Sequence, residues 1–210
     1  ISSTAPASFH RFFSGSGQAQ TLTDDHIRAL AVDSTGNLWV GTDRGLNLLP
    51  ADQTGSLHPR FTSFAHAAGE WKRLACDTVR TLRVDRSGAL WIGAVHGLHH
   101  LRQDNGALRL QTFLSDPLDP HRLSNNNVCA LWEDEEGFIW VGTDGGGLNR
   151  LNPAVGRFDV WRNIPRDPHS LSHNEIRSLF QDRSGLLWVG TYGGGASKVN
   201  VHRKQFTHYR

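Results

Sequence analysis

One five-residue pattern occurs four times in this chain and constrains its fold more than any other feature. The copies are LWVGT (38–42), LWIGA (90–94), IWVGT (139–143) and LWVGT (187–191). Their tryptophans are separated by 52, 49 and 48 residues, and they are Trp39, Trp91, Trp140 and Trp188. A period near 50 residues indicates a repeat architecture, in which one supersecondary unit recurs and packs on its neighbours.

Each copy contains the same order of short segments. An apolar stretch that ends in Asp comes first, a turn with Gly follows, and the Trp stretch comes next. A Gly-rich turn then leads to a further apolar stretch, and an aromatic stretch closes the copy. The segments are rich in β-branched and aromatic residues and are bounded by turn formers, which is typical of strands. Four strands with tight connections predict an antiparallel sheet, and such sheets repeated every 40–50 residues or so are the blades of a β-propeller.

We therefore expect an all-β chain, a β-propeller segment over residues 1–210 built of four-stranded antiparallel blades. The expected blades span about 22–64, 74–113, 123–161 and 171–209, and an outer strand at 9–13 (FHRFF) precedes them. In each copy the Asp is expected to cap the turn, and the Gly three residues later to supply a positive φ. The Trp is expected to fill the gap between neighbouring sheets, and the Gly two residues after it to leave room for the next sheet.

Composition limits the classes of partner. The 210 residues carry a net charge of +2 with acids and bases interspersed, which gives no electrostatic case for nucleic acid or an anionic membrane surface. No apolar run approaches the ~20 residues that span a bilayer, and the first residues do not form a signal peptide. Methionine is absent, so we expect the chain to be excised from something longer. The two cysteines, Cys76 and Cys129, fit neither a disulfide framework nor a zinc site and leave the redox compartment undecided.

The repeat resembles a known family. The stretch IRSLFQDRSGLLWVGTYGGGASKVN (176–200) is similar to the two-component regulator propeller repeat, and the other three copies match its pattern. The resemblance implies a periplasmic, ligand-sensing and non-catalytic segment of a bacterial inner-membrane receptor. It also implies a cytoplasmic output, a histidine kinase or a diguanylate cyclase, and a membrane attachment that both lie outside this chain. Copy 2 departs from the pattern at Ala94 and His96.

The number of blades leaves three interpretations open. The chain could form an open arc that pairs with a second copy into an eight-bladed ring, because the Trp-, Leu- and Phe-rich faces of an arc drive association. It could close alone as a four-bladed propeller, since propellers run from 4 to 8 blades. It could also be a piece of a longer receptor. We favour the homodimer that forms through the blade faces.

The first candidate site is a set of arginines at one position of the first strand. Copies 1, 2 and 4 carry Arg28, Arg80 and Arg177 there, and copy 3 carries Cys129. The first strand of a blade borders the central channel, so three guanidinium groups near one axis could hold a carboxylate, sulfate or phosphate. The alternative is that each Arg pairs with a nearby Asp or with carbonyl groups of the adjacent blade.

The second candidate site lies in the Gly-rich turns, because loops on a rigid scaffold carry variable chemistry. Its residues are Asp43, Arg44, Asp144 and Tyr192. The alternative is simple turn capping by Asp. Together the two sets predict a small-molecule ligand that is anionic or a carbohydrate.

Metal binding and catalysis have little support in the sequence. His96, His99 and His100 are near one another, but the last two lie on one strand and face opposite sides, so we expect no metal site. No cofactor motif and no nucleophile or zinc-protease motif is present. We therefore expect no enzyme and no cofactor. A carbohydrate-active propeller enzyme, a lyase or glycosidase, is the alternative function.

Overall fold

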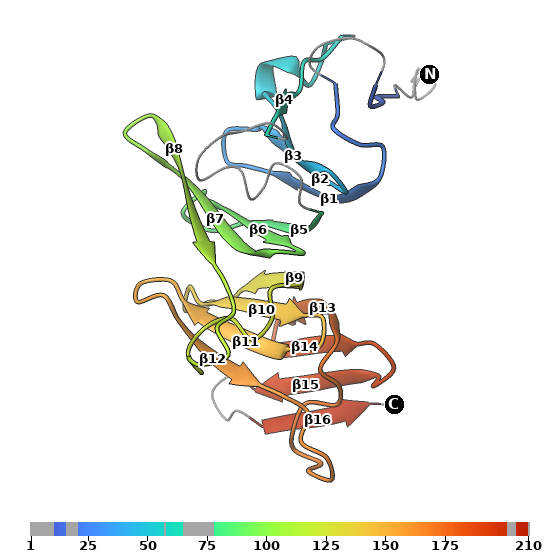
Figure 1. The fold of residues 1–210 in the computed structure, drawn as a ribbon, viewed down its shortest axis with the longest axis vertical. Helices are drawn as coiled ribbons and strands as arrows, with labels where there is room; N and C mark the ends of the chain where they lie inside the picture. Colours follow the sequence, from blue (N-terminus) through green and yellow to red (C-terminus); the bar gives the residue numbers. More distant parts are fainter. Residues whose placement is uncertain (1–10, 16–20, 57, 65–77, 201–204, 210) are drawn as a thin grey trace, which may run out of the picture.

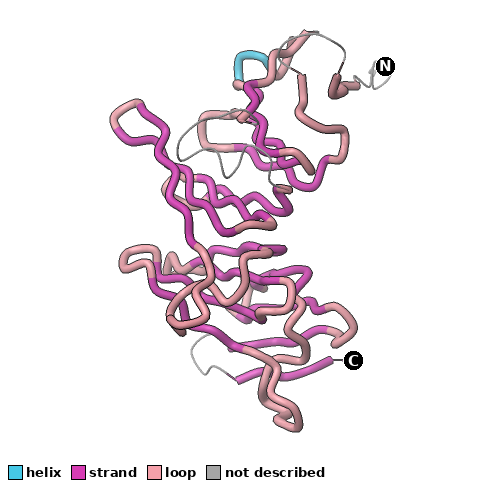
Figure 2. Tube along the Cα trace, viewed as in Figure 1, coloured by secondary structure: helices cyan, strands magenta, loops and turns pink. Residues whose placement is uncertain are grey.

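The computed structural model describes residues 11–15, 21–56, 58–64, 78–200 and 205–209. Within these residues the strands form four antiparallel four-stranded sheets, each with its strands in chain order (Figures 1 and 2). The first sheet contains β1 (Ile27–Val32), β2 (Leu38–Thr42), β3 (Gly45–Leu49) and β4 (Thr62–Ser63). The second contains β5 (Val79–Val84), β6 (Leu90–Ala94), β7 (Gly97–Asp104) and β8 (Ala107–Phe113). The third contains β9 (Val128–Glu133), β10 (Ile139–Thr143), β11 (Gly147–Asn152) and β12 (Arg157–Trp161). The fourth contains β13 (Ile176–Gln181), β14 (Leu186–Thr191), β15 (Ala196–Asn200) and β16 (Gln205–Tyr209).

The four sheets are blades of a propeller, as the repeat predicts. Their first strands, β1, β5, β9 and β13, pack successively against one another, so they form the inner edge of the arrangement. The only helix in the described part of the chain is a short 3₁₀ turn, η1 (Ala51–Gln53), which follows β3. No helix there is long and apolar enough to cross a membrane. The sequence predicts an outer strand at 9–13, but residues 11–13 are not in a strand because they pair with no other strand. Residues 9 and 10 lie outside the described residues.

The repeated aspartate organises each blade from its turn. One oxygen of Asp134 accepts the backbone N–H groups of Glu136 and Phe138 at 3.0 Å, and the other accepts the indole N–H of Trp140 at 2.8 Å. The same Asp-to-Trp bond, 2.7–2.9 Å long, recurs in every blade, and the pairs are Asp33–Trp39, Asp85–Trp91, Asp134–Trp140 and Asp182–Trp188. Glycine at the turn has a φ of 78–86° in all four copies, as expected. The carboxylate thus joins the turn to the ring that packs between blades.

These hydrogen bonds stabilise the ionised carboxylates. Hydrogen bonds from Ser184 and Trp188 lower the pKa of Asp182 to about 2. Burial alone would raise the pKa of Asp33 and of Asp85, but the hydrogen bonds they accept outweigh it, and the pKa of each is lowered. The turns therefore contribute stability at neutral pH that is lost in acid.

The cores lie between blades. One buried apolar cluster joins the first and second sheets, one joins the second and third, and one joins the third and fourth. The tryptophans of the first three copies each belong to one of these clusters and are 1–5% exposed, which confirms the role expected for Trp39, Trp91 and Trp140. No buried cluster of the described residues joins the fourth sheet to the first, and these sheets lie at opposite ends of the long axis (Figure 1). The blades therefore form an open arc, and four-bladed closure does not occur in this structure.

Candidate functional site

A β-bulge occurs at the same place in each inner strand. In the first sheet Ile27 pairs with Thr42 and Ala29 pairs with Gly41, so the residue between them has no partner across the ladder. The other three sheets have the same irregularity. The four bulge residues are Arg28, Arg80, Cys129 and Arg177. The extra residue of a bulge does not follow the alternation of side chains between the two faces of a sheet. The side chains of these four residues therefore do not point along the blade faces.

The bulge residues meet in one cavity. It has a volume of about 280 Å³ and is lined by the four bulge side chains together with Thr78. The structure thus brings together the three arginines that the sequence singles out, although they come from three different blades. Sequence reasoning aligned their positions but did not predict the bulge that turns them out of the sheets.

Arg28 is paired with an aspartate of its own blade. Its Nε and Nη2 donate to Oδ1 and Oδ2 of Asp43 at 2.8 and 2.9 Å, a bidentate arrangement. This pairing raises the pKa of Arg28 and lowers the pKa of Asp43. The expected alternative, in which an arginine pairs with a nearby aspartate, therefore holds for Arg28.

The second and fourth blades lack such an aspartate, since Val95 and Tyr192 stand where the first blade has Asp43. Their arginines instead share Asp144, the turn residue of the third blade. Its carboxylate lies 3.7 Å from Nη1 of Arg80 and 3.7 Å from Nη2 of Arg177. Two predicted sets of residues, the arginines and the turns, therefore form one mixed-charge site.

Arg177 has further partners. Its Nη2 donates to Oε2 of Glu175 at 3.1 Å, and its guanidinium carbon lies 5.0 Å from the ring centre of Tyr192, which is exposed. Tyr192 therefore contacts an arginine of the cavity without lining the cavity itself. Arg44 does not line the cavity, because its Nε is directed to Asp24 at 3.5 Å.

Arg80 has the weakest partners of the three arginines. Its Nη1 donates to Sγ of Cys129 at 3.4 Å, and among the described residues its one ion pair is the 3.7 Å approach to Asp144. Burial raises the pKa of the Cys129 thiol, so the sulfur is neutral at neutral pH and is a weak acceptor. The Arg80 side chain is 33% exposed. Within the part of the chain that the structure describes, most of its N–H donors are therefore available to a ligand in the cavity. Cys129 forms no disulfide, and Cys76 lies outside the described residues.

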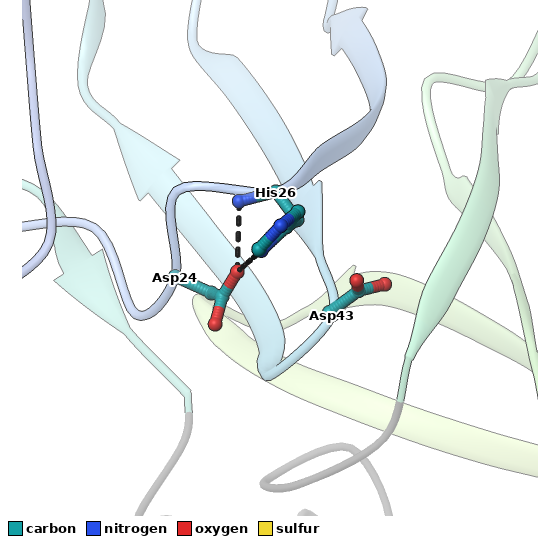
Figure 3. Close-up of side chains that lie close together, drawn as sticks. All are labelled: Asp24, His26 and Asp43. Atoms are coloured by element: carbon teal, nitrogen blue, oxygen red, sulfur yellow. Dashed lines mark hydrogen bonds and ion pairs between the residues drawn. The ribbon is translucent and has the colours of Figure 1, made fainter.

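A histidine and two carboxylates lie beside this site. Asp24, His26 and Asp43 each offer one ligand atom, and these atoms lie within 4.8 Å of one another (Figure 3). Oδ1 of Asp24 accepts a hydrogen bond from the backbone N–H of His26 at 2.7 Å, and it lies 2.9 Å from Nδ1 of the His26 ring. The backbone hydrogen bond lowers the pKa of Asp24. Arg28 and Arg44 already neutralise the two carboxylates, which makes them poorer metal ligands. The sequence analysis did not single out Asp24 and His26.

The three predicted histidines do not converge. His99 is opposite Ile92 and His100 is opposite Trp91, so they face opposite sides of the second sheet, as strand alternation requires. His99 is buried and makes a 3.0 Å hydrogen bond with Thr112. The ring of His100 stacks on that of Trp91 with the centres 4.0 Å apart. Both residues serve the packing of the blade.

Comparison with protein families identifies the repeat. The family model described as "Two component regulator propeller" matches residues 21–44, 122–145 and 170–193. The matched segments fall in the first, third and fourth blades. The second copy, which departs from the pattern at Ala94 and His96, is not matched, and the fourth is matched although its sequence also departs, at Ala196 and Ser197. Comparison with the curated proteins returns no match.

Solved structures share the fold. The extracellular domain assigned to the hybrid two component system BT3049 of B. thetaiotaomicron matches with a TM-score of 0.74 and 22% identity, over 90% of this chain and 25% of that one. The extracellular domain assigned to the one component system BT4673 of the same organism has a TM-score of 0.64 and 20% identity, over 90% and 22%. Virginiamycin B lyase of Staphylococcus aureus has a TM-score of 0.60 and 14% identity, over 88% and 56%. This chain thus spans about a quarter of the length of the two extracellular domains.

Proposed function

Because the chain carries two component regulator propeller repeats, we propose that it is a ligand-sensing, non-catalytic segment of an extracytoplasmic receptor domain. The fold that it shares with the extracellular domain assigned to BT3049 supports this proposal. In a bacterium with two membranes the segment would lie in the periplasm. Membrane attachment and the kinase or cyclase output would be supplied by parts outside these residues.

The observation that carries the proposal is the cavity formed by the four bulge residues. Three arginines line one space of about 280 Å³, near the lower limit of ordinary ligand pockets, and two turn aspartates, Asp43 and Asp144, form ion pairs with them. Charges of both signs suit a small ligand with one anionic group and several hydroxyl groups, such as a sugar acid. In our proposal Arg80 binds the anionic group, because its own partners are the weakest.

Ligand binding in this cavity would act on several blades at once, since each contributes one bulge residue. A ligand that holds Arg80 and Arg177 together stabilises one arrangement of the second, third and fourth blades relative to others. A shift in the populations of these arrangements is the signal that the receptor would transmit.

The test is binding of inorganic sulfate and of glucuronate, measured by calorimetry and by the melting temperature. We expect at least one of these probes to stabilise the native chain, and Arg80→Gln to weaken its binding at least about 10-fold, because a charged hydrogen-bond donor is lost. Arg44→Gln is the matched control, because Arg44 lies outside the cavity. Equal affinity in the native chain and the Arg80 variant would contradict the proposed site.

The alternative function is a carbohydrate-active enzyme. One observation favours it: Asp24 holds the exposed imidazole of His26 in the way that a general base is oriented. Incubation with uronic-acid oligosaccharides separates the two functions. Product formation that is lost in His26→Gln supports the enzyme, and stabilisation without turnover supports the sensing segment.

A further inference from the structure

The carboxylate of Asp144 lies between two of the arginines that line the cavity. Its Oδ2 is 3.7 Å from Nη1 of Arg80, and its Oδ1 is 3.7 Å from Nη2 of Arg177. One oxygen thus faces an arginine of the second blade and the other faces an arginine of the fourth, although Asp144 belongs to the turn between β10 and β11 of the third blade. An anionic ligand in the cavity would face the same two guanidinium groups. Asp144 and such a ligand therefore compete for the same positive charge.

The turn itself does not require an aspartate at this position. The equivalent residues of the other blades are Asp43, Val95 and Tyr192. In all four turns the backbone N–H of this residue donates to the carbonyl group of the residue before the inner strand, at 2.9–3.2 Å. A valine and a tyrosine thus complete the turn as well as an aspartate does. Turn formation therefore does not explain the carboxylate of Asp144.

Asp144 neutralises the two arginines without positioning them. A separation of 3.7 Å is too long for a hydrogen bond, so the interaction is an attraction between charges that fixes no orientation. Other groups hold the guanidinium groups in place. Arg80 donates to Sγ of Cys129 at 3.4 Å. Arg177 donates to Glu175 at 3.1 Å. Both arginines should therefore keep their positions when the charge of Asp144 is removed.

Asp144 matters most for the charge of Arg80. Arg28 and Arg177 each have another carboxylate within 3.1 Å, whereas among the described residues the pair with Asp144 is the only ion pair of Arg80. The Arg80 side chain is only 33% exposed, so water screens its charge incompletely. Without the negative charge at residue 144, the cavity would carry a surplus positive charge that a ligand anion could neutralise.

We propose that Asp144 is a built-in counter-anion that lowers the affinity of the cavity for anionic ligands. The proposal rests on the function proposed above, because it concerns the same cavity. A ligand anion gains little from the charge of Arg80 and Arg177 while Asp144 already neutralises them. Its other contacts must therefore supply much of the affinity. The native site accordingly favours ligands that carry hydroxyl groups beside the anionic group over simple inorganic anions, and Asp144 determines this specificity.

Asp144→Asn tests the proposal, because it removes the charge and keeps the shape of the side chain. Nδ2 of Asn127 donates to Oδ2 of Asp144 at 3.1 Å, and an amide oxygen accepts the same bond. Oδ1 of Asn127 is buried and has no hydrogen-bond partner in the part of the chain that the structure describes, so it offers an acceptor to the new NH₂ group. Asp144→Ser is a second uncharged variant, and its hydroxyl group also accepts. Circular dichroism and melting should show that both variants fold like the native chain.

Asp119→Asn is the matched control. It makes the same change of charge, and it also removes an ion pair with an arginine, the 3.4 Å contact between Asp119 and Arg122. Asp119 lies in the loop between the second and third blades and does not line the cavity. An effect of net charge alone would appear equally in this control.

Calorimetry measures the dissociation constants of glucuronate and of inorganic sulfate. We expect Asp144→Asn to bind glucuronate at least about 5-fold more tightly than the native chain, because a negative charge close to the bound anion is removed. The gain should be larger for sulfate, because the Coulomb energy grows with the charge of the ligand. Asp144→Ser should give a gain of the same order. Asp119→Asn should change neither dissociation constant by more than about 2-fold.

The outcomes separate this inference from the function proposed for the cavity. If the native chain binds a probe and Asp144→Asn binds it no more tightly, the inference is overturned and the proposed function stands. Binding by Asp144→Asn but not by the native chain supports the inference. Absence of binding by the native chain and by both variants overturns the inference and the proposed ligand class together. Equal gains for sulfate and glucuronate, or equal gains in Asp144→Asn and Asp119→Asn, overturn the role of the charge at residue 144.

Discussion

Replacing Asp134 by Asn tests whether the repeated aspartate holds its blade together. The Asp134 side chain is 3% exposed, and both of its carboxylate oxygens accept hydrogen bonds. Its Oδ1 accepts two backbone N–H groups, and its Oδ2 accepts the indole N–H of Trp140 and two N–H groups of Arg150. Asn has the same shape but only one oxygen. If that oxygen keeps the backbone bonds, the amide NH₂ faces Trp140 and Arg150, which are donors themselves.

The expected loss of stability follows from these contacts. A buried hydrogen bond to a charged group contributes ~1.5–3 kcal/mol. Breaking a buried ion pair costs ~3–5 kcal/mol because the remaining charge is left without its partner. Arg150 keeps a contact with the half-exposed Glu136, which offsets part of this cost. We therefore expect Asp134→Asn to lower the free energy of unfolding by about 3 kcal/mol, and the melting temperature by about 6–12 °C for a chain of this size.

Urea unfolding followed by tryptophan fluorescence and circular dichroism measures this change. A double-mutant cycle with Arg150→Met isolates the pair, and we expect a coupling free energy of about 1–3 kcal/mol between Asp134 and Arg150. A loss below about 1 kcal/mol in Asp134→Asn would fall short of a single charged hydrogen bond. That result would refute the view that the carboxylate joins the turn to the Trp140 ring.

Three further changes address other parts of the repeat. Gly93→Ala places a Cβ 2.6 Å from Cγ1 of Val128 in the next blade and should destabilise the chain by ~1–3 kcal/mol in urea unfolding. Trp91→Phe keeps an aromatic ring but removes the N–H that Asp85 accepts, and thermal unfolding should show a loss of ~1–3 kcal/mol. Asp182 has a pKa of about 2 in the folded chain, so its stabilising effect is complete above about pH 4 and is lost as the pH falls through 2. Asp182→Asn should flatten the acid limb of the stability–pH curve in that window, as measured by melting at successive pH values.

Each of these changes has an outcome that would contradict its reasoning. Gly55→Ala is the control for Gly93, because a Cβ there meets no atom within 4 Å and the change should be nearly neutral. An equal effect at both glycines would argue against the close packing of Val128 on Gly93. A Trp91→Phe variant as stable as the native chain would show that the indole bond contributes nothing. An unchanged acid limb in Asp182→Asn would assign the acid sensitivity to other carboxyl groups.

Much of the fold follows from the sequence because its signals are local. The turn after each inner strand is determined by an Asp and a Gly three residues apart, and Asp134 and Gly137 behave as that spacing predicts. The repeat period gives the number of sheets. The Trp and Gly of each LWVGT-type segment are packing residues, which their size alone indicates. Strand alternation was also enough to place His99 and His100 on opposite faces.

The candidate site depended on information that the sequence does not contain locally. Residues 28, 80 and 177 are about 50 or more positions apart, and only the curvature of the arc and three β-bulges direct them into one cavity. The sharing of Asp144 between Arg80 and Arg177 depends on contacts between different blades. The sequence analysis also did not predict the hydrogen bond from the indole N–H to the aspartate. A capping Asp uses one carboxylate oxygen in the turn, and nothing in the repeat pattern shows which group the second oxygen binds.

What the sequence determined by itself is the blade, because the turn chemistry and strand pattern of one repeat act within some twenty to forty residues. What the tertiary structure alone decided is how the blades face one another. Ile27 and Val79 occupy the same position of the repeat, yet Ile27 is 42% exposed and Val79 is fully buried against Gly41 of the blade before it. The physical reason is that the burial of this residue depends on the blade beside it, and the pattern within one blade contains no information about its neighbour.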